Sequence, residues 1–193
     1  MKTTCEQCKC DFDAAGARGR TPKYCSGRCR QRANSARASV LPAFMRERVA
    51  WCRAAGKRPI MVDGAPASST NPATWSKFAG VKTGAGDGFG VMLGNGVGCY
   101  DIDHCYIDGV LDGWVFEFIK TIDEPIIYAE RSISGEGLHV FIKTDERAGQ
   151  KLRFMGKTVE AYTRQRFIRT TLNTAKEVMA YAGSGTEEKR STP

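Results

Sequence analysis

Two carboxylates stand in an otherwise largely apolar stretch, Val97 to Cys105, which reads VGCYDIDHC. Side chains alternate along a β-strand, so Asp101 and Asp103 would point to one face, about 6 to 7 Å apart along the chain. Two like charges at this spacing are costly unless a positive charge lies between them. We therefore expect a cation over this face of the strand.

Two further polar side chains occupy strand-like runs downstream. In GLHVFIK, His139 lies on the opposite face from Leu138 and Val140, and it follows SISGEG, whose glycines would let a backbone or a phosphate come close. In TVEAY, Glu160 faces away from its apolar neighbours. Taken alone, a histidine on a strand is more often structural, and such a glutamate is more often an ordinary solvent-facing residue.

Four cysteines near the N-terminus, Cys5, Cys8, Cys25 and Cys29, follow the spacing C-x2-C-x16-C-x3-C. Two close pairs separated by a loop can enclose a tetrahedral Zn²⁺, and in a reducing compartment clustered cysteines more often hold metal than form disulfides. Because so short a segment has almost no core, metal binding would supply its folding energy. Cys10 is an alternative to Cys8 as a ligand.

The charge of the chain is positive and uneven. The formal net charge is +8, and between Arg18 and Arg58 twelve Lys or Arg residues face a single acid, Glu47. This balance favours a polyanion as the large partner, and the many arginines favour phosphate contacts. The sequence has no apolar run of membrane-spanning length and no signal peptide, so we expect a cytoplasmic protein without a membrane partner.

The elements expected from the sequence group into four parts. Residues 1–37 form a zinc knuckle followed by a basic helix, Arg28 to Arg37, and 38–56 form a connecting helix. Residues 57–175 form the main domain, and 176–193 form a small, polar, partly disordered tail. The strand-rich centre with few helices predicts an α+β fold with a mixed β-sheet and flanking helices.

Within the main domain, Asn71 and Pro72 signal a helix start, and the apolar stripe from Leu111 to Ile122 predicts a second helix. Strands are expected at Phe89 to Leu93, in two runs joined by SGEG and in two runs, TVEAY and RFIRTT, joined by TRQ as a second hairpin. The glycine-rich segment TGAGDGFGVMLGNGVG is not a phosphate-binding P-loop, because no Lys-Ser/Thr pair closes it.

The order of these motifs, D-x-D, S-x-S-G-x-G-x-H, an isolated Glu on a late strand and then R-F-I, resembles the archaeo-eukaryotic primase superfamily. It is most similar to the bifunctional primase/polymerase domain of phages and plasmids. The segment KRPIMVDGAPASSTNPATWSKF extends the match upstream, so that the resemblance covers about Trp51 to Thr171.

The resemblance implies a primase-polymerase core with two Mg²⁺ or Mn²⁺ ions held by Asp101, Asp103 and Glu160. It further implies that His139, with Ser132 or Ser134, contacts the phosphates of the incoming nucleotide. The remaining candidate phosphate ligands are Arg166 and Lys77 or Lys57.

The function implied is template-dependent nucleotidyl transfer by a DNA primase or primase-polymerase in phage or plasmid replication, in the host cytoplasm if the chain is phage-encoded. Its partners would be single-stranded DNA template, nucleoside triphosphates and a separately encoded helicase. Three alternatives stay open: a catalytically silent nucleic-acid-binding protein of the same fold with a regulatory or counter-defence role, a two-metal nuclease, and, more distantly, a D-x-D glycosyltransferase.

Overall fold

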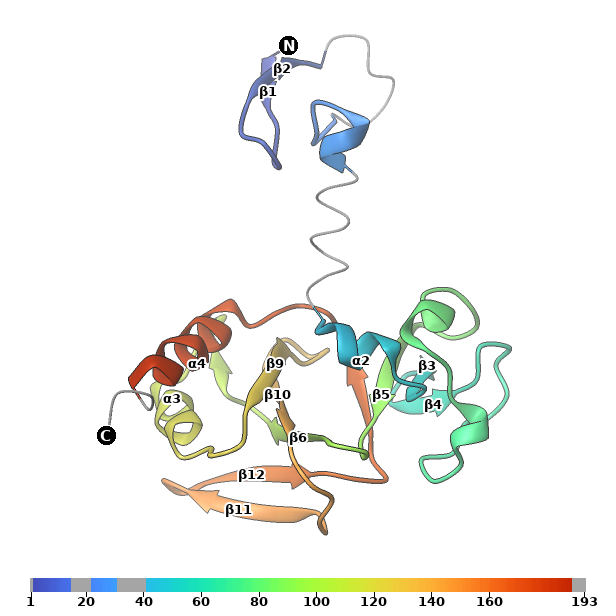
Figure 1. The fold of residues 1–193 in the computed structure, drawn as a ribbon. Coiled ribbons are helices and arrows are strands. Elements are labelled where there is room, and N and C mark those ends of the chain that lie inside the picture. Colours follow the sequence, from blue (N-terminus) through green and yellow to red (C-terminus); the bar gives the residue numbers. More distant parts are fainter. Residues whose placement is uncertain (1, 15–21, 31–40, 189–193) are drawn as a thin grey trace. The chain divides into compact units, whose positions relative to one another are not determined.

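The computed structural model describes residues 2–14, 22–30 and 41–188, of which 183–188 are described by their backbone alone. The chain divides into two compact units, Met1–Leu41 and Pro42–Pro193. Strands outnumber helices among the described residues, so the fold is α+β, as the sequence predicted. The expected mixed β-sheet is wrong, because every strand pairing among the described residues is antiparallel. Figure 1 shows the elements of each unit.

The N-terminal unit contains a short antiparallel pair, β1 (Lys2–Thr4) and β2 (Asp11–Asp13). The Thr4 hydroxyl donates a hydrogen bond of 2.8 Å to Asp11 and ties the two strands together. A helix begins at Gly27 and is described as far as Arg30. The rest of the predicted basic helix, residues 31–37, lies outside the described part of the chain.

The larger sheet of the second unit has five antiparallel strands in the order β11, β12, β6, β10, β9. Their bounds are β6 (Val97–Ile102), β9 (Ile126–Arg131), β10 (Leu138–Lys143), β11 (Gln150–Phe154) and β12 (Lys157–Tyr162). The expected hairpin around SGEG is confirmed, because β9 and β10 pair along their length. The strand that carries Asp101 is the centre of this sheet.

Two helices, α3 (Gly113–Lys120) and α4 (Lys176–Glu188), cover one face of the five-stranded sheet (Figure 1). The alternation of the strands buries every second side chain beneath them. This core contains Tyr100, Ile102, Leu138, Val140 and Ile142 from the strands and Trp114, Val115, Phe118, Ile119 and Val178 from the helices. The polar residues between these positions therefore face the other side of the sheet.

The second sheet has four antiparallel strands in the order β13 (Phe167–Thr170), β5 (Gly88–Met92), β3 (Trp51–Ala55) and β4 (Arg58–Ile60). Three aromatic rings pack on it: the Trp51 centroid lies 4.8 Å from that of Phe78 and 6.2 Å from that of Phe89. The chain passes between the two sheets twice, from β5 to β6 and from β12 to β13.

Short elements complete the second unit: α2 (Ala43–Glu47), the 3₁₀ helices η1 (Pro72–Thr74) and η2 (Phe78–Val81), and the hairpin of β7 (Tyr106–Ile107) with β8 (Val110–Leu111). The helix start predicted at Asn71 is confirmed as a single 3₁₀ turn, whose Ala73 N–H donates to the Asn71 side chain at 3.1 Å.

The connecting helix expected over 38–56 is wrong in its second half. Helix α2 ends at Glu47, and Trp51–Ala55 forms the strand β3. Trp51, Cys52, Arg53 and Ala54 are all buried, so both faces of this strand are covered and its apolar residues show no alternation. A short apolar run of this kind resembles a helical stripe in sequence.

The second predicted hairpin is also wrong, because β12 pairs with β11 and β6, whereas β13 pairs with β5 in the other sheet. The actual partner, β11, has a polar sequence, QKLRF, typical of an edge strand. It joins β12 through Met155 and Gly156, both at positive φ, as a two-residue hairpin turn requires.

Two further boundaries differ from the sequence prediction. Helix α3 begins at Gly113 and not at Leu111, because Leu111 pairs with Tyr106 in the β7–β8 hairpin. Residues 176–193 are expected from the sequence to form a partly disordered tail, but helix α4 spans Lys176–Glu188, and 189–193 lie outside the described residues. No helix within the described ranges is both long enough and apolar enough to cross a membrane.

Candidate functional site

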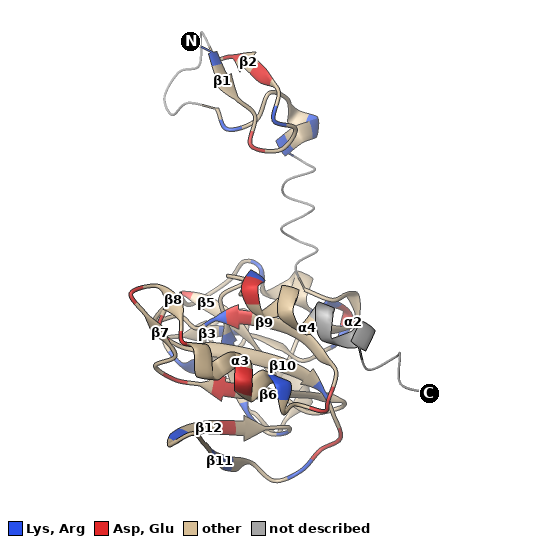
Figure 2. Ribbon diagram, turned by 90° about the vertical axis from the view of Figure 1, so that its left-hand side faces the viewer, with Lys and Arg blue, Asp and Glu red and all other residues tan. Residues whose placement is uncertain are grey.

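The strand register aligns a row of charged residues across the five-stranded sheet, on the face away from α3 and α4. His139 on β10 pairs with Glu130 on β9 and with Asp101 on β6. Asp101 in turn pairs with Glu160 on β12, which pairs with Lys151 on β11. Figure 2 shows the acidic positions on the neighbouring strands β9, β6 and β12. Directly opposed residues have Cβ atoms about 5 Å apart, so the row is continuous.

This row borders a pocket of about 560 Å³ between the two sheets. Seven of the residues predicted from the sequence line it: Lys57, Asp101, Asp103, Ser132, Ser134, His139 and Arg166. Strand β13 contributes Phe167, Ile168 and Arg169 on the opposite wall. The pocket therefore combines acids and a histidine from one sheet with basic side chains from the other.

Asp101 is the acid nearest the centre of the site. Its side chain is 20% exposed, and its Oδ1 lies 3.6 Å from His139 Nε2. Burial raises the pKa of the Asp101 carboxyl; His139 opposes this rise, whereas the charges of Asp103 and Glu160 add to it. Because burial and the neighbouring acids disfavour its ionised form, this carboxylate would be stabilised by a cation bound in the pocket.

Asp103 differs from its predicted place. Strand β6 ends at Ile102, so Asp103 lies exposed in the following turn and not on the strand face shared with Asp101. Both aspartates nevertheless line the pocket. His104, the next residue, is exposed at positive φ, and its Nδ1 lies 3.3 Å from Glu136.

Glu160 stands beside Asp101 in register but does not itself line the pocket. Its carboxylate accepts a hydrogen bond of 2.5 Å from the Tyr162 hydroxyl and pairs with Lys151 Nζ at 2.9 Å. The Tyr162 hydrogen bond, followed by Lys151, lowers the pKa of Glu160. The Arg166 guanidinium lies over the Tyr162 ring, 4.4 Å from its centroid.

The loop between β9 and β10 presents hydroxyl groups to the pocket. Ser132 Oγ accepts a hydrogen bond from Gly137 N at 3.0 Å, and Ser134 Oγ accepts one from Glu136 N at 3.3 Å. The two hydroxyl oxygens lie 3.0 Å apart. At most one of the two hydroxyls can donate to the other, so at least one hydroxyl proton remains available to an anion in the pocket.

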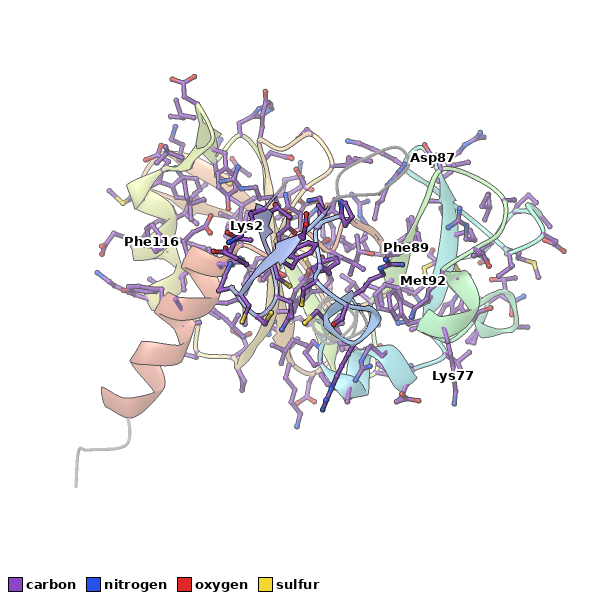
Figure 3. All side chains as sticks on the ribbon, turned by 90° about the horizontal axis from the view of Figure 1, so that it is seen from above. Lys2, Lys77, Asp87, Phe89, Met92 and Phe116 are labelled. Carbon is purple, nitrogen blue, oxygen red and sulfur yellow. The ribbon has the colours of Figure 1, made fainter. Side chains whose placement is uncertain are left out.

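Lys77, in contrast, does not belong to this pocket. It is exposed immediately before η2, on the outer side of the four-stranded sheet, where Figure 3 shows it projecting outward. Lys57 takes its place as the pocket lysine. Arg169 braces the turn before Lys57, because its guanidinium donates to the Gly56 carbonyl and pairs with Asp87 at 3.1 Å.

Glu130 is the residue at the site that the sequence reading missed. Its side chain is fully buried, and its Oε1 lies 3.2 Å from His139 Nδ1. The backbone N–H groups of Thr171 and Leu172 also donate to it, at 3.1 and 2.9 Å. The predicted hairpin around SGEG puts Glu130 on the same face of the sheet as His139 but opposite Phe141. The structure pairs Glu130 directly with His139, because the loop is the longer segment Ser132–Gly137.

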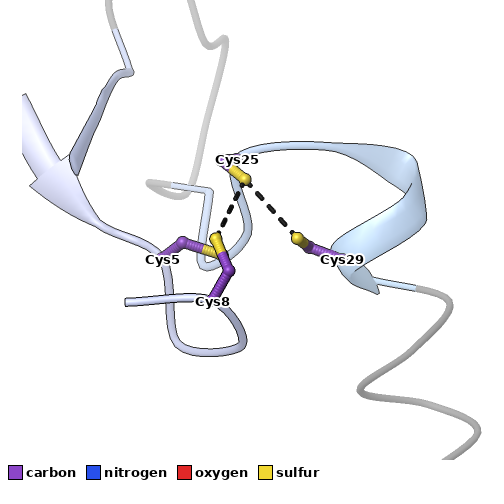
Figure 4. Close-up of side chains that lie close together, drawn as sticks. All are labelled: Cys5, Cys8, Cys25 and Cys29. Atoms are coloured by element: carbon purple, nitrogen blue, oxygen red, sulfur yellow. Dashed lines mark hydrogen bonds between the residues drawn. The ribbon is translucent and has the colours of Figure 1, made fainter. Parts of the chain in front are cut away.

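The N-terminal unit brings its four predicted cysteines together. The sulfur atoms of Cys5, Cys8, Cys25 and Cys29 all lie within 4.8 Å of one another, and Figure 4 shows the close approaches of Cys25 to Cys8 and to Cys29. Cys10 is outside this group, with its thiol directed to the Cys8 carbonyl at 3.6 Å. The four cysteines could hold a metal ion such as zinc.

The thiols of this cluster differ in acidity: the pKa values of Cys5 and Cys8 are lowered, whereas hydrogen bonds to Cys29, Cys8 and Cys5 raise the pKa of Cys25 to about 12. Burial opposes ionisation of Cys5, but backbone N–H groups of Cys8, Cys25 and Gln7 outweigh it and lower the pKa of the Cys5 thiol to about 6. Within the described ranges, these cysteines are the one group of three or more metal-binding side chains whose ligand atoms come so close. The carboxylates of Asp101, Asp103 and Glu160 do not converge to that degree.

No protein-family model matches the chain, and no curated protein matches its sequence.

Proposed function

We propose that the chain carries out template-dependent nucleotidyl transfer as a DNA primase or primase-polymerase, related to the bifunctional primase/polymerase group of the archaeo-eukaryotic primases. The observation that carries the proposal is the pocket between the sheets. Asp101, Asp103 and His139 line it together with two serine hydroxyls and basic side chains. Acids beside phosphate-binding donors are the combination that nucleotidyl transfer requires.

The oxygen atoms of Asp101 and Asp103 are ligands that Mg²⁺ and Mn²⁺ prefer. The raised pKa of Asp101 also supports a cation site, because a bound cation would stabilise the ionised carboxylate. When bound, such ions neutralise the triphosphate and activate the primer hydroxyl. Glu160 would become a third metal ligand if its ion pair with Lys151 were broken, and the exposed Lys151 side chain can turn into solvent.

The nucleotide would meet donors from both walls of the pocket. His139 and the hydroxyls of Ser132 and Ser134 would donate to its phosphates from one side. Lys57 and Arg166 would balance their charge from the other. Arg166 is held ready by its stacking on Tyr162, which restricts the guanidinium without using its N–H groups.

The decisive experiment measures synthesis on single-stranded template with labelled ribo- or deoxynucleotides, with and without primer, in Mg²⁺ and in Mn²⁺. We expect the wild-type chain to incorporate nucleotide, and Asp101→Asn and Asp103→Asn to abolish incorporation. Asp108→Asn is the matched control, because Asp108 lies in the β7–β8 turn, outside the pocket, at a positive φ that Asn accepts. Unchanged synthesis by Asp101→Asn would refute the proposal.

We further propose that the four cysteines hold Zn²⁺ and that the N-terminal unit binds template through its basic residues. Phosphate contacts make such binding fall with salt. A competing function, silent nucleic-acid binding, is favoured by one observation, the engagement of Glu160 by Lys151 and Tyr162. The same assay separates the two, since a silent protein binds template without incorporating nucleotide, and a nuclease shortens the labelled strand.

A further inference from the structure

Glu130 is a fully buried carboxylate with both oxygens engaged. Oε1 faces His139 Nδ1 at 3.2 Å and the Thr171 N–H at 3.1 Å. Oε2 faces the N–H groups of Thr171 and Leu172 at 3.1 and 2.9 Å. A buried carboxylate is stable only when hydrogen-bond donors surround it in this way, so each of these groups must offer a proton to Glu130.

The backbone donors come from the segment that leaves β13, so Glu130 also joins the two sheets. Leu172 adopts a positive φ of 57° at this point, a conformation uncommon for a non-glycine residue. The Arg131 N–H donates to the Asn173 carbonyl next to it. This network fixes the position of the Glu130 carboxylate, and therefore of the imidazole that it contacts.

The two ring nitrogens of His139 face different groups. Nδ1 faces the fully buried Glu130 on the neighbouring strand β9, whereas Nε2 points toward Asp101 at the pocket, 3.6 Å from Oδ1. The hydrogen bond made by one ring nitrogen decides which nitrogen carries the proton and how the ring is oriented.

We propose that Glu130 is a positioning residue, which holds a proton on His139 Nδ1 and so fixes the ring with Nε2 directed into the pocket, where Nε2 donates when the ring carries a second proton. The role of the ring toward a nucleotide phosphate rests on the function proposed above. The location of the proton does not, and it can be measured in the protein without substrate.

The Glu130→Gln variant tests this with almost no change of volume. Glutamine replaces one acceptor oxygen with an NH₂ donor. The backbone N–H groups of Thr171 and Leu172 cannot lose their protons, so the remaining amide oxygen must stay with them. The NH₂ then faces Nδ1, which can accept only if its proton is absent, so the proton moves to Nε2.

The chain has two histidines, so ¹⁵N-edited NMR of the imidazole rings gives two sets of signals. We expect His139 Nδ1 to show the shift of a protonated nitrogen in the wild type and of an unprotonated nitrogen in Glu130→Gln. The exposed His104 is the internal control, assigned by His104→Gln, and should not change. An unprotonated Nδ1 in the wild type, or an unchanged His139 in Glu130→Gln, would overturn the proposal.

A functional readout separates positioning from general stability. We expect Glu130→Gln to reduce incorporation about 10- to 100-fold, comparable to the cost of losing the hydrogen-bond partner of a metal-ligating histidine. The reason is that the ring can no longer carry protons on both nitrogens, so it would contact the phosphates as a neutral donor and not as a charged one. In a His139→Asn background the same substitution should have no further effect, because its target is gone. A loss that persists undiminished in that background would identify Glu130 as merely structural.

Folding of each variant is checked by urea unfolding. If Glu130→Gln does not fold, Glu130→Asp, which keeps both acceptor oxygens, replaces it and should retain the proton on Nδ1. Absence of incorporation by every chain, including the wild type, would count against the primase proposal alone and would leave the NMR result to decide the role of Glu130.

Discussion

Removal of metal from the N-terminal unit should unfold that unit and leave the second unit intact. Among residues 2–30 that the structure describes, the buried apolar side chains are Cys5 and Cys29. Burying two small thiol side chains contributes only a few kcal/mol at about 25 cal/mol per Å². A segment of this length cannot fold on so little apolar burial.

Zinc changes this balance decisively, since a structural zinc site supplies about 10 to 16 kcal/mol of apparent binding free energy at neutral pH. We therefore expect chelation to release one zinc per chain and to collapse the amide dispersion of residues 2–14 and 22–30 in a ¹H–¹⁵N spectrum. Trp51, Trp75 and Trp114 all lie in the second unit, so their fluorescence should report an unchanged urea midpoint.

The paired variants Cys8→Ser and Cys10→Ser sharpen the test. Cys8 belongs to the four-sulfur cluster, and Cys10, two residues away, does not. Cys8→Ser should weaken zinc binding strongly and Cys10→Ser hardly at all. If the zinc-free protein keeps the amide dispersion of this unit, or if Cys10→Ser is the variant that loses zinc, the reasoning from this geometry is wrong.

Three further outcomes are expected. Ile102→Ala, a fully buried position in the central strand, should lower the free energy of unfolding by about 2 to 5 kcal/mol, as measured by urea titration of tryptophan fluorescence. Burial raises the pKa of Asp101, so the native state loses stability as the pH rises through that pKa. In buffer without divalent ions, Asp101→Asn should therefore be more stable than the wild type at pH 7, and the difference should disappear in acid. Lys151→Met should change stability by less than about 1 kcal/mol, since Lys151 is 74% exposed, but should raise Mn²⁺ affinity in a titration if Glu160 is a ligand.

Sequence reasoning succeeded where alternation along a strand decides the outcome. The opposed faces of Leu138 and His139, the β9–β10 hairpin and the four-cysteine group all follow from local spacing. It failed where the structure of a segment depends on packing partners that are distant in the sequence. Trp51–Ala55 is a strand because both its faces are covered by other elements, which its own pattern does not reveal.

The candidate site shows the same division. Asp101 and His139 could be placed on strand faces, but their opposition depends on the pairing of β6 with β10, strands separated by the whole of α3 and β9. Arg166 and Lys57 reach the pocket only because the second sheet faces the first, whereas Lys77 points away. Glu130 drew no prediction, because its burial and its contacts with Thr171 and Leu172 depend on residues far from it in the chain.

The charged row across the sheet also constrains how the sequence can vary. If β10 slipped by one residue against β6 and β9, His139 would turn toward the helices and Leu138 would enter the pocket. The same slip would turn Lys143, which shares a face with His139, into the hydrophobic core, so the misaligned chain would not fold stably. A single-residue insertion within β6, β9 or β10 should therefore destabilise the fold. The loop from Ser132 to Gly137, in contrast, can change in length with the core intact.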